Sequence, residues 1–235
     1  MKKFSVIKNR AAKRKGGSSK LEDLLPVVSS VRKLRALPND RVLATMTRCI
    51  NNAGFNWSVI EKKWPQFEEA FHGFDVDKLS MLPPEDWEAY LQDKRIVRNW
   101  QKIDAVRSNV DFVLEVAAQH GSFAKFVAAW PCSDQVGLLK FLKANGKRLG
   151  GNTGQYFLRF IGKDSFMLTQ DVVTALQDAG VDINDQPTSQ RDMLRAQEAF
   201  NEWHEQTGLS YTNLSRIASY SAGSNYPVGQ LFQSH

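Results

Sequence analysis

The sequence has little cysteine and little histidine. Its 235 residues include two cysteines, Cys49 and Cys132, and four scattered histidines. Two cysteines argue against a disulfide framework, and so few soft or imidazole ligands do not favour a structural zinc site. We therefore expect a chain that uses neither a bound metal nor a cofactor.

Long hydrophobic runs are also missing. No apolar stretch approaches the roughly 20 residues that a membrane-spanning helix needs. The N-terminus is too polar for a secretory signal, which requires an apolar central segment. We expect a protein of the cytoplasm with no membrane partner.

Acidic residues are absent from the first 20 positions. Residues 1–20 contain eight lysines or arginines and no acid, whereas the whole chain has a formal net charge of +6. Such a segment is typical of a flexible basic arm that binds nucleic acid or another anionic surface by releasing counterions. A solvated, disordered tail explains the same composition equally well.

Alternating strand patterns are not found, and the apolar residues recur at helical spacing instead. The longest such segment runs from residue 95 to residue 118, and an amphipathic helix before it is expected to be interrupted at Pro65. We therefore predict an all-α protein. A helical domain is expected over residues 21–222, after the basic arm and before an irregular tail at 223–235.

The most informative stretch is a predicted helical hairpin at about 141–171. A helix leads into the turn Gly150-Gly151, a second helix follows from Asn152 to Ile161, and a third opens near Asp171. Asn152 is a plausible N-cap, because its side chain can accept from the free N–H groups of the first turn. Two glycines supply the positive φ of a tight turn and leave the backbone uncovered.

This hairpin favours contact with a phosphate backbone. A helix N-terminus carries partial positive charge and unpaired N–H groups, which bind anions. The residues that we predict to bind DNA are Lys147, Arg148, Gly150, Gly151, Asn152 and Thr153. An ordinary corner between two helices remains the alternative for the hairpin taken alone.

A second group of residues lies around the predicted end of a helix at Ala53-Gly54. Most aromatic residues in this region have helical spacing and belong to the core. Asn51, Asn52, Phe55 and Trp57 differ, because a helix end lets their side chains face a cleft.

Two sequence blocks and the hairpin resemble the 3-methyladenine DNA glycosylase I family of the helix-hairpin-helix superfamily. The blocks are AGFNWSVIEKKWPQFEEAFHGFD and RIVRNWQKIDAVRSN, and the hairpin reads LGGNTGQYFLRF-IG. The resemblance spans about residues 44–176 and implies a two-lobed, all-helical fold with a cleft between the lobes. It further implies that the hairpin grips double-stranded DNA while a damaged nucleotide is flipped into a pocket, where its N-glycosidic bond is cut.

The chain departs from the family pattern at three positions. The family glutamate that reads the base corresponds to Cys49, which therefore joins Asn51, Asn52, Phe55 and Trp57 as a base-pocket residue. The family's zinc-binding histidine and cysteine would fall on Asp171 and Ala175, so we predict no zinc. These departures indicate a divergent member.

Asp171 is the carboxylate that we predict to be catalytic. Related enzymes place an aspartate at the start of the helix after the hairpin, where it stabilises positive charge on the sugar. If the helix is aligned with related enzymes on the valines that follow, the aspartate position falls on Gln170 instead. Asp171 could then serve only as an N-cap or a partner of the helix dipole. Asp164, in a Gly-Lys-Asp-Ser turn, is a weaker choice.

The sequence thus predicts a monomeric, monofunctional DNA glycosylase that removes alkylated purines from duplex DNA. A DNA-binding protein that kept the hairpin but lost the chemistry remains the main alternative. Two features favour that alternative: Cys49 replaces the glutamate that reads the base, and the alignment does not settle whether Asp171 or Gln170 holds the catalytic position. A helical interaction protein that binds no DNA is a third possibility.

Overall fold

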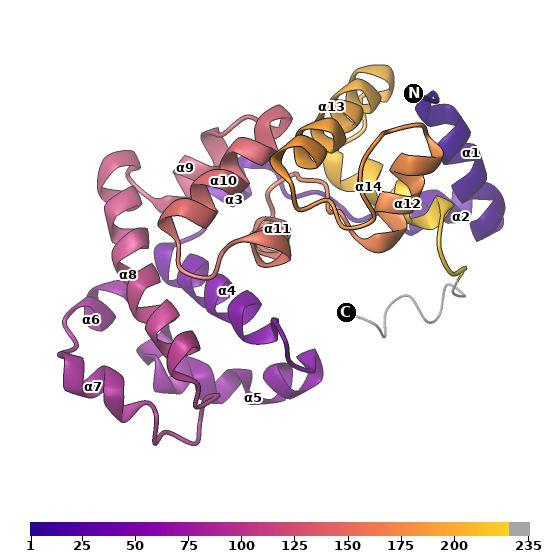
Figure 1. The fold of residues 1–235 in the computed structure, drawn as a ribbon. Coiled ribbons are helices and arrows are strands. Elements are labelled where there is room, and N and C mark those ends of the chain that lie inside the picture. Colours follow the sequence, from indigo (N-terminus) through magenta and orange to yellow (C-terminus); the bar gives the residue numbers. More distant parts are fainter. Residues whose placement is uncertain (226–235) are drawn as a thin grey trace. The chain divides into compact units, whose positions relative to one another are not determined.

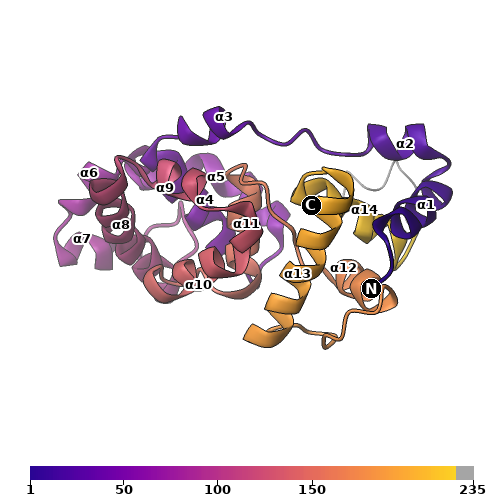
Figure 2. The ribbon, with the colours of Figure 1, turned by 90° about the horizontal axis from the view of Figure 1, so that it is seen from above.

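The computed structural model describes residues 1–225, and this part of the chain is helical throughout with no β-strand. The prediction of an all-α fold is confirmed. Figures 1 and 2 show the helices as they follow along the chain. They are α1 (Phe4–Lys15), α2 (Ser18–Asp23), α3 (Val31–Arg35), α4 (Asn39–Asn52), α5 (Trp57–Ala70), η1 (His72–Phe74), α6 (Val76–Ser80), α7 (Pro84–Ala89), α8 (Trp100–His120), α9 (Phe123–Ala129), η2 (Cys132–Asp134), α10 (Gln135–Asn145), α11 (Gly151–Phe160), α12 (Gln170–Asp178), α13 (Gln190–Thr207) and α14 (Tyr211–Ser221).

The chain divides into two compact units, and each unit is built from segments that are not continuous in the sequence. Unit 1 contains residues 1–28, 132–136 and the described residues from 164 onward, whereas unit 2 contains residues 29–131 and 137–163. The predicted hairpin region at 141–171 is therefore shared, since α11 belongs to unit 2 and α12 to unit 1. Of the irregular tail predicted at 223–235, residues 226–235 lie outside the described residues.

Unit 1 contradicts the prediction that residues 1–20 form a flexible arm. Residues 4–15 are the regular helix α1, which packs along α14, and Figure 2 shows these first and last of the described helices. Phe4, Ile7 and Ala11 recur at helical spacing and are buried in the core of this unit. The composition was misleading because Lys8 and Lys13 lie on other faces of the same helix, where their charged ends reach water.

Unit 2 is built around α8, the longest of the described helices. It packs against α4, α6 and α9, and its buried residues include Ile103, Val106 and Val110. The neighbouring helix α5 runs unbroken through Pro65, so the expected interruption is wrong. Pro65 lies on the exposed side of α5, where water can satisfy the carbonyl group that the proline leaves without an N–H partner.

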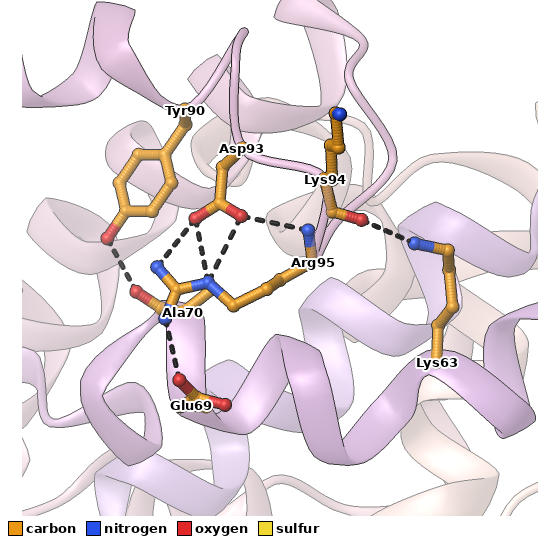
Figure 3. A network of polar contacts seen from close by, with 7 residues as sticks. All are labelled: Lys63, Glu69, Ala70, Tyr90, Asp93, Lys94 and Arg95. Carbon is orange, nitrogen blue, oxygen red and sulfur yellow. Dashed lines mark hydrogen bonds and ion pairs between the residues drawn. The ribbon is translucent and has the colours of Figure 1, made fainter.

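A network of polar contacts fixes the loop before α8 to α5 (Figure 3). Arg95 binds both carboxylate oxygens of Asp93 at 2.7–3.1 Å and donates to Glu69 Oε1 on α5 at 3.0 Å. Tyr90 donates its hydroxyl to the carbonyl oxygen of Ala70 at 2.8 Å. The network sets where α8 begins, because Arg95 lies only five residues before it.

Within the described residues, no helix is both long and apolar enough to cross a membrane.

The packing of α1 makes a prediction for stability. Phe4 is fully buried, with its ring centroid 5.2 Å from that of Trp203, and we expect Phe4→Ala to lower the free energy of unfolding by about 3–5 kcal/mol. Val6, on the same helix, is 52% exposed, so Val6→Ala should change it by less than about 0.5 kcal/mol. Urea denaturation of both variants measures the difference. Equal midpoints would show that α1 does not contribute to the core.

Candidate functional site

The hairpin between α10 and α11 is a tight turn over residues 146–150. A Cβ at Gly146 would collide with the side chain of Leu149 and crowd the backbone of Leu142, so only glycine fits there. Leu149 is fully buried beneath the turn, while Arg148 adopts a positive φ of 61°. The turn is therefore held by packing beneath it, at the cost of a strained backbone at one arginine.

Asn109 on α8 connects the hairpin to the rest of unit 2. Its side-chain amide accepts from the N–H of Lys147 at 2.8 Å and donates to the carbonyl oxygen of Lys147 at 3.1 Å. Asn109 is fully buried, so it pairs both backbone groups of one turn residue away from water. Sequence reasoning missed this residue, although it is the last residue of the block RIVRNWQKIDAVRSN.

The two basic residues of the turn have partners on α8. Lys147 forms an ion pair with Asp104, and Arg148 donates to Gln101 Oε1 at 2.8 Å. Both contacts are exposed to solvent, where such a pair contributes at most about 1 kcal/mol. These partners were not foreseen from the sequence, and a phosphate group has to compete with them.

The N-terminus of α11 carries no side-chain cap. Gly150 occupies the N-cap position, so the prediction that Asn152 caps this helix is wrong. Asn152 lies inside the first turn and accepts instead from Gln155 at 3.3 Å. Gly151 is exposed, with open space where a Cβ would stand, and Thr153 is half-buried. The N–H groups of this first turn are thus available to an anion.

The C-terminal end of α4 holds three of the predicted base-pocket residues. Cys49 is buried, and burial raises the pKa of its thiol to about 12, so it is a neutral apolar group. Asn51 and Asn52 are also buried, and their Oδ1 atoms have no hydrogen-bond partner among the described residues. An unpaired buried acceptor costs about 1–3 kcal/mol, which a ligand with N–H groups can recover.

Lys102 on α8 caps the same C-terminal end of α4. Its ammonium group donates to the carbonyl oxygens of Asn51 at 2.8 Å and of Ala53 at 3.0 Å, and only 4% of the residue is exposed. Burial lowers the pKa of this group to about 8. The cation thus satisfies two carbonyl groups at the C-terminal end of a helix.

Two aromatic residues extend from this end of α4 toward the hairpin helix. Phe55 is 43% exposed and lies under the Lys102 ammonium, 4.2 Å from its ring centroid. Trp57 begins α5 and contacts Tyr156 and Phe160 of α11 edge-on, at centroid distances of 4.9 and 6.1 Å. Unit 2 therefore brings together the hairpin and the predicted base-pocket residues, as α11 packs on α4.

Asp171 lies in the first turn of α12, in unit 1. Thr169 caps this helix and accepts from the N–H of Val172 at 3.4 Å, so Asp171 is not the N-cap. Gln170 is exposed, whereas Asp171 is half-buried. Burial raises the pKa of the Asp171 carboxyl, while Arg14 and Lys15 of α1 act in the opposite direction. Sequence reasoning missed both cations, because α1 was expected to be a flexible arm.

Asp164 has a structural task. Its two carboxylate oxygens accept from the N–H groups of Tyr211 at 3.2 Å and Thr212 at 2.8 Å, at the start of α14. The carboxylate is thereby occupied by a helix N-terminus. This leaves Asp171 as the stronger choice for a catalytic group.

The residues at the family's zinc positions do not fit a zinc ion. Ala175 has no donor atom and is fully buried, and Asp171 supplies a single carboxylate. In the described part of the chain, no three side chains of His, Cys, Asp or Glu gather in a way that could hold a metal.

The role of Asn109 can be tested by its removal. We expect Asn109→Ala to lower the free energy of unfolding by about 2–4 kcal/mol, because both backbone groups of Lys147 lose their partner. Ser108→Ala is the matched control, since this hydroxyl only donates to the Asp104 carbonyl of its own helix. Hydrogen exchange at the Lys147 amide should accelerate in the first variant alone. An unchanged rate in Asn109→Ala would contradict the assignment.

Comparison with known proteins agrees with these features. Residues 39–140 match the family model for methyladenine glycosylase. DNA-3-methyladenine glycosylase 1 of Escherichia coli is 33% identical over 75 residues, and the DNA-3-methyladenine glycosylase of Haemophilus influenzae is 29% identical over 75 residues. Each alignment covers 32% of this chain and 40% of the relative, so it spans less than half of these proteins.

The fold is shared more widely than the sequence. The crystal structure of a Methanocaldococcus jannaschii 8-oxoguanine glycosylase/lyase, in complex with a 15mer DNA containing 8-oxoguanine, matches with a TM-score of 0.54 at 15% identity. The match covers 92% of this chain and 96% of that one, which confirms the helical glycosylase fold. The comparisons also support the resemblance that the motifs indicate, because residues 39–140 match the family model for methyladenine glycosylase and part of this segment is similar to the two named relatives.

Proposed function

We propose that this protein is a DNA glycosylase that flips an alkylated purine out of duplex DNA and hydrolyses its N-glycosidic bond. One observation carries the proposal. The family segment 39–140 contributes Asn109, and Asn109 holds the hairpin whose uncapped helix end is suited to phosphate. The two curated relatives carry the name DNA-3-methyladenine glycosylase, which supports the choice of an alkylated purine.

The hairpin supplies the proposed contact with the DNA backbone. The first-turn N–H groups of α11 bind one phosphate, and the side chains of Lys147 and Arg148 exchange their partners on α8 for phosphate oxygens. These contacts offset the few kcal/mol that flipping a nucleotide costs.

The end of α4 supplies the proposed contacts with the flipped base. Stacking on an aromatic ring contributes about 1–3 kcal/mol per base, and we assign this role to Phe55, which is exposed, and to Trp57, which is half-buried. A cationic alkylated purine gains further from cation–π attraction. The unpaired Oδ1 atoms of Asn51 and Asn52 accept from N–H groups of such a base.

Asp171 supplies the proposed chemistry. As the bond between C1′ and the base nitrogen breaks, its electron pair leaves with the cationic base, which becomes neutral, and positive charge develops on the sugar. The Asp171 carboxylate stabilises that charge until a water molecule adds to C1′ and loses a proton. Water is the nucleophile, so the proposed enzyme is monofunctional, and we expect it to act as a cytoplasmic monomer.

A noncatalytic DNA-binding protein is the second possibility, and Cys49 favours it. The family glutamate at this position can accept a hydrogen bond from a base as an anion. The thiol of Cys49 stays neutral at any physiological pH, because burial raises its pKa to about 12. A protein of this second kind binds duplex DNA in a salt-dependent manner and releases no base.

Release of methylated bases from duplex DNA tests the proposal. We expect the intact chain to release 3-methyladenine or 7-methylguanine, with the single-turnover rate lowered about a hundredfold in Asp171→Asn. Trp57→Ala should weaken the productive complex by about 5- to 150-fold, through the loss of one stacking contact.

Two matched variants control for structural damage. Asp178→Asn removes the other carboxylate of α12, which is in a surface pair with Arg10, and Val59→Ala truncates an exposed side chain of α5. Both should retain the rate of the intact chain. No release from methylated DNA, together with tight salt-dependent binding, would contradict the glycosylase and leave the noncatalytic protein.

A further inference from the structure

Two segments from opposite ends of the sequence meet beside Asp171. Arg14, near the end of α1, donates to the carbonyl oxygens of Tyr220 at 2.9 Å, Ala222 at 3.1 Å and Gly223 at 2.6 Å. One arginine thus binds three carbonyl oxygens between residues 220 and 223, where the chain leaves α14. Charged donors make hydrogen bonds about twice as strong as neutral ones, so this contact fixes the segment after α14.

Lys15 completes the junction between the two segments. Its ammonium group donates to Asn225 Oδ1 at 3.1 Å, and the Asn225 amide donates back to the carbonyl oxygen of Arg14 at 3.2 Å. Only 6% of Lys15 is exposed, although it is a lysine near the end of a helix. We call residues 222–225 the C-terminal clasp.

The clasp lies directly against the Asp171 carboxylate. Gly223 adopts a φ of 64°, and a Cβ added to this residue would overlap the Asp171 side chain. No larger residue fits, so the backbone of Gly223 covers one side of the carboxylate.

Arg14 and Lys15 are the charged groups that act on this carboxylate from α1. On α14, the ring of Tyr220 lies beneath two cations. The Lys15 ammonium is 5.1 Å from the ring centroid, and the Arg216 guanidinium is 5.9 Å from it. On α12 itself, Asp178 is paired with Arg10. Burial raises the pKa of Asp171, and the two cations of α1 lower it.

We propose that Arg14 and Lys15 are positioning residues that act through Asp171: they hold the C-terminal clasp against the carboxylate and keep it negatively charged for the reaction. This inference rests on the proposed function, in which Asp171 stabilises the positive sugar. It gives α1 a part in the chemistry, because this N-terminal helix influences the charge of a carboxylate that lies more than 150 residues further along the sequence.

The direct test is the pKa of Asp171 in the full-length protein, measured by carbon NMR of its carboxyl group. Replacing Lys15 by methionine removes a cation, which disfavours the carboxylate, so the pKa must rise. Lys8→Met is the matched control, because Lys8 lies on the same helix in an exposed pair with Glu22. We expect no change of the Asp171 pKa in this control, and an unchanged pKa in Lys15→Met would overturn the proposal.

The rate of base release, measured as a function of pH, is the second test of the proposal. A higher pKa leaves more Asp171 protonated in acid, so Lys15→Met should release base about three- to tenfold more slowly at low pH and at the normal rate at high pH. Lys15→Arg restores the cation and should restore the rate at low pH. A purely structural role would instead lower the rate equally at every pH, and that result would overturn the proposal.

Gly223→Ala tests the clasp without changing any charge. The added methyl group displaces either the clasp or the carboxylate, so the rate should fall at every pH, and a full rate would overturn the placement of the clasp. The NMR measurement needs no activity and therefore separates the two proposals. If no variant releases base while the Asp171 pKa still rises in Lys15→Met, the proposed function fails and the coupling to α1 stands.

Discussion

The burial of α1 is the constraint on which the structure of unit 1 depends. Phe4, Ile7 and Ala11 enter a core formed with α12, α13 and α14, and burial of a large apolar side chain contributes about 1.5–3 kcal/mol. Those contributions outweigh the mutual repulsion of a helix rich in lysine and arginine, on which Lys8 and Lys13 keep their charged ends in water. The same packing places Arg14 and Lys15 beside Asp171, so the charge around the proposed catalytic carboxylate is set by the N-terminal helix.

In unit 2, a single helix organises the proposed binding surface. From α8, Lys102 pairs with carbonyl groups at the end of α4, and Asn109 pairs with the backbone of the hairpin turn. Both side chains are buried and bind main-chain groups, so one helix fixes two irregular segments. The asparagines and aromatic residues that we assign to the base, and the helix end that we assign to phosphate, both depend on this helix for their placement.

The sequence predicted the elements that depend on local patterns. Helical spacing gave the all-α class, glycines marked the hairpin, and two motif blocks indicated a family resemblance that the match of residues 39–140 supports. The failures concern long-range contacts. The spacing of Phe4, Ile7 and Ala11 was visible, but whether a basic helix finds a core depends largely on α12, α13 and α14, which begin more than 150 residues after α1. Composition alone therefore suggested a flexible arm.

The contacts of the polar residues in the site could not be predicted from local sequence patterns either. Lys102 and Asn109 belong to one recognisable block, yet their buried contacts join segments some 40–50 residues apart, which no local pattern encodes. Asn152 is a good N-cap by type, but the turn places Gly150 at that position instead. The roles proposed for Asp171, Trp57 and the hairpin residues stay predictions, since they concern a DNA substrate.

We assign to Asp171 the stabilisation of positive charge on the sugar of the damaged nucleotide. Duplex binding should therefore distinguish a cationic pyrrolidine analogue of the abasic sugar from its neutral tetrahydrofuran counterpart, measured side by side at one salt concentration. We predict that the intact chain prefers the cationic duplex by about tenfold or more, and that Asp171→Asn loses this preference. Equal affinity for the two duplexes, or a preference that persists in Asp171→Asn, would contradict the account.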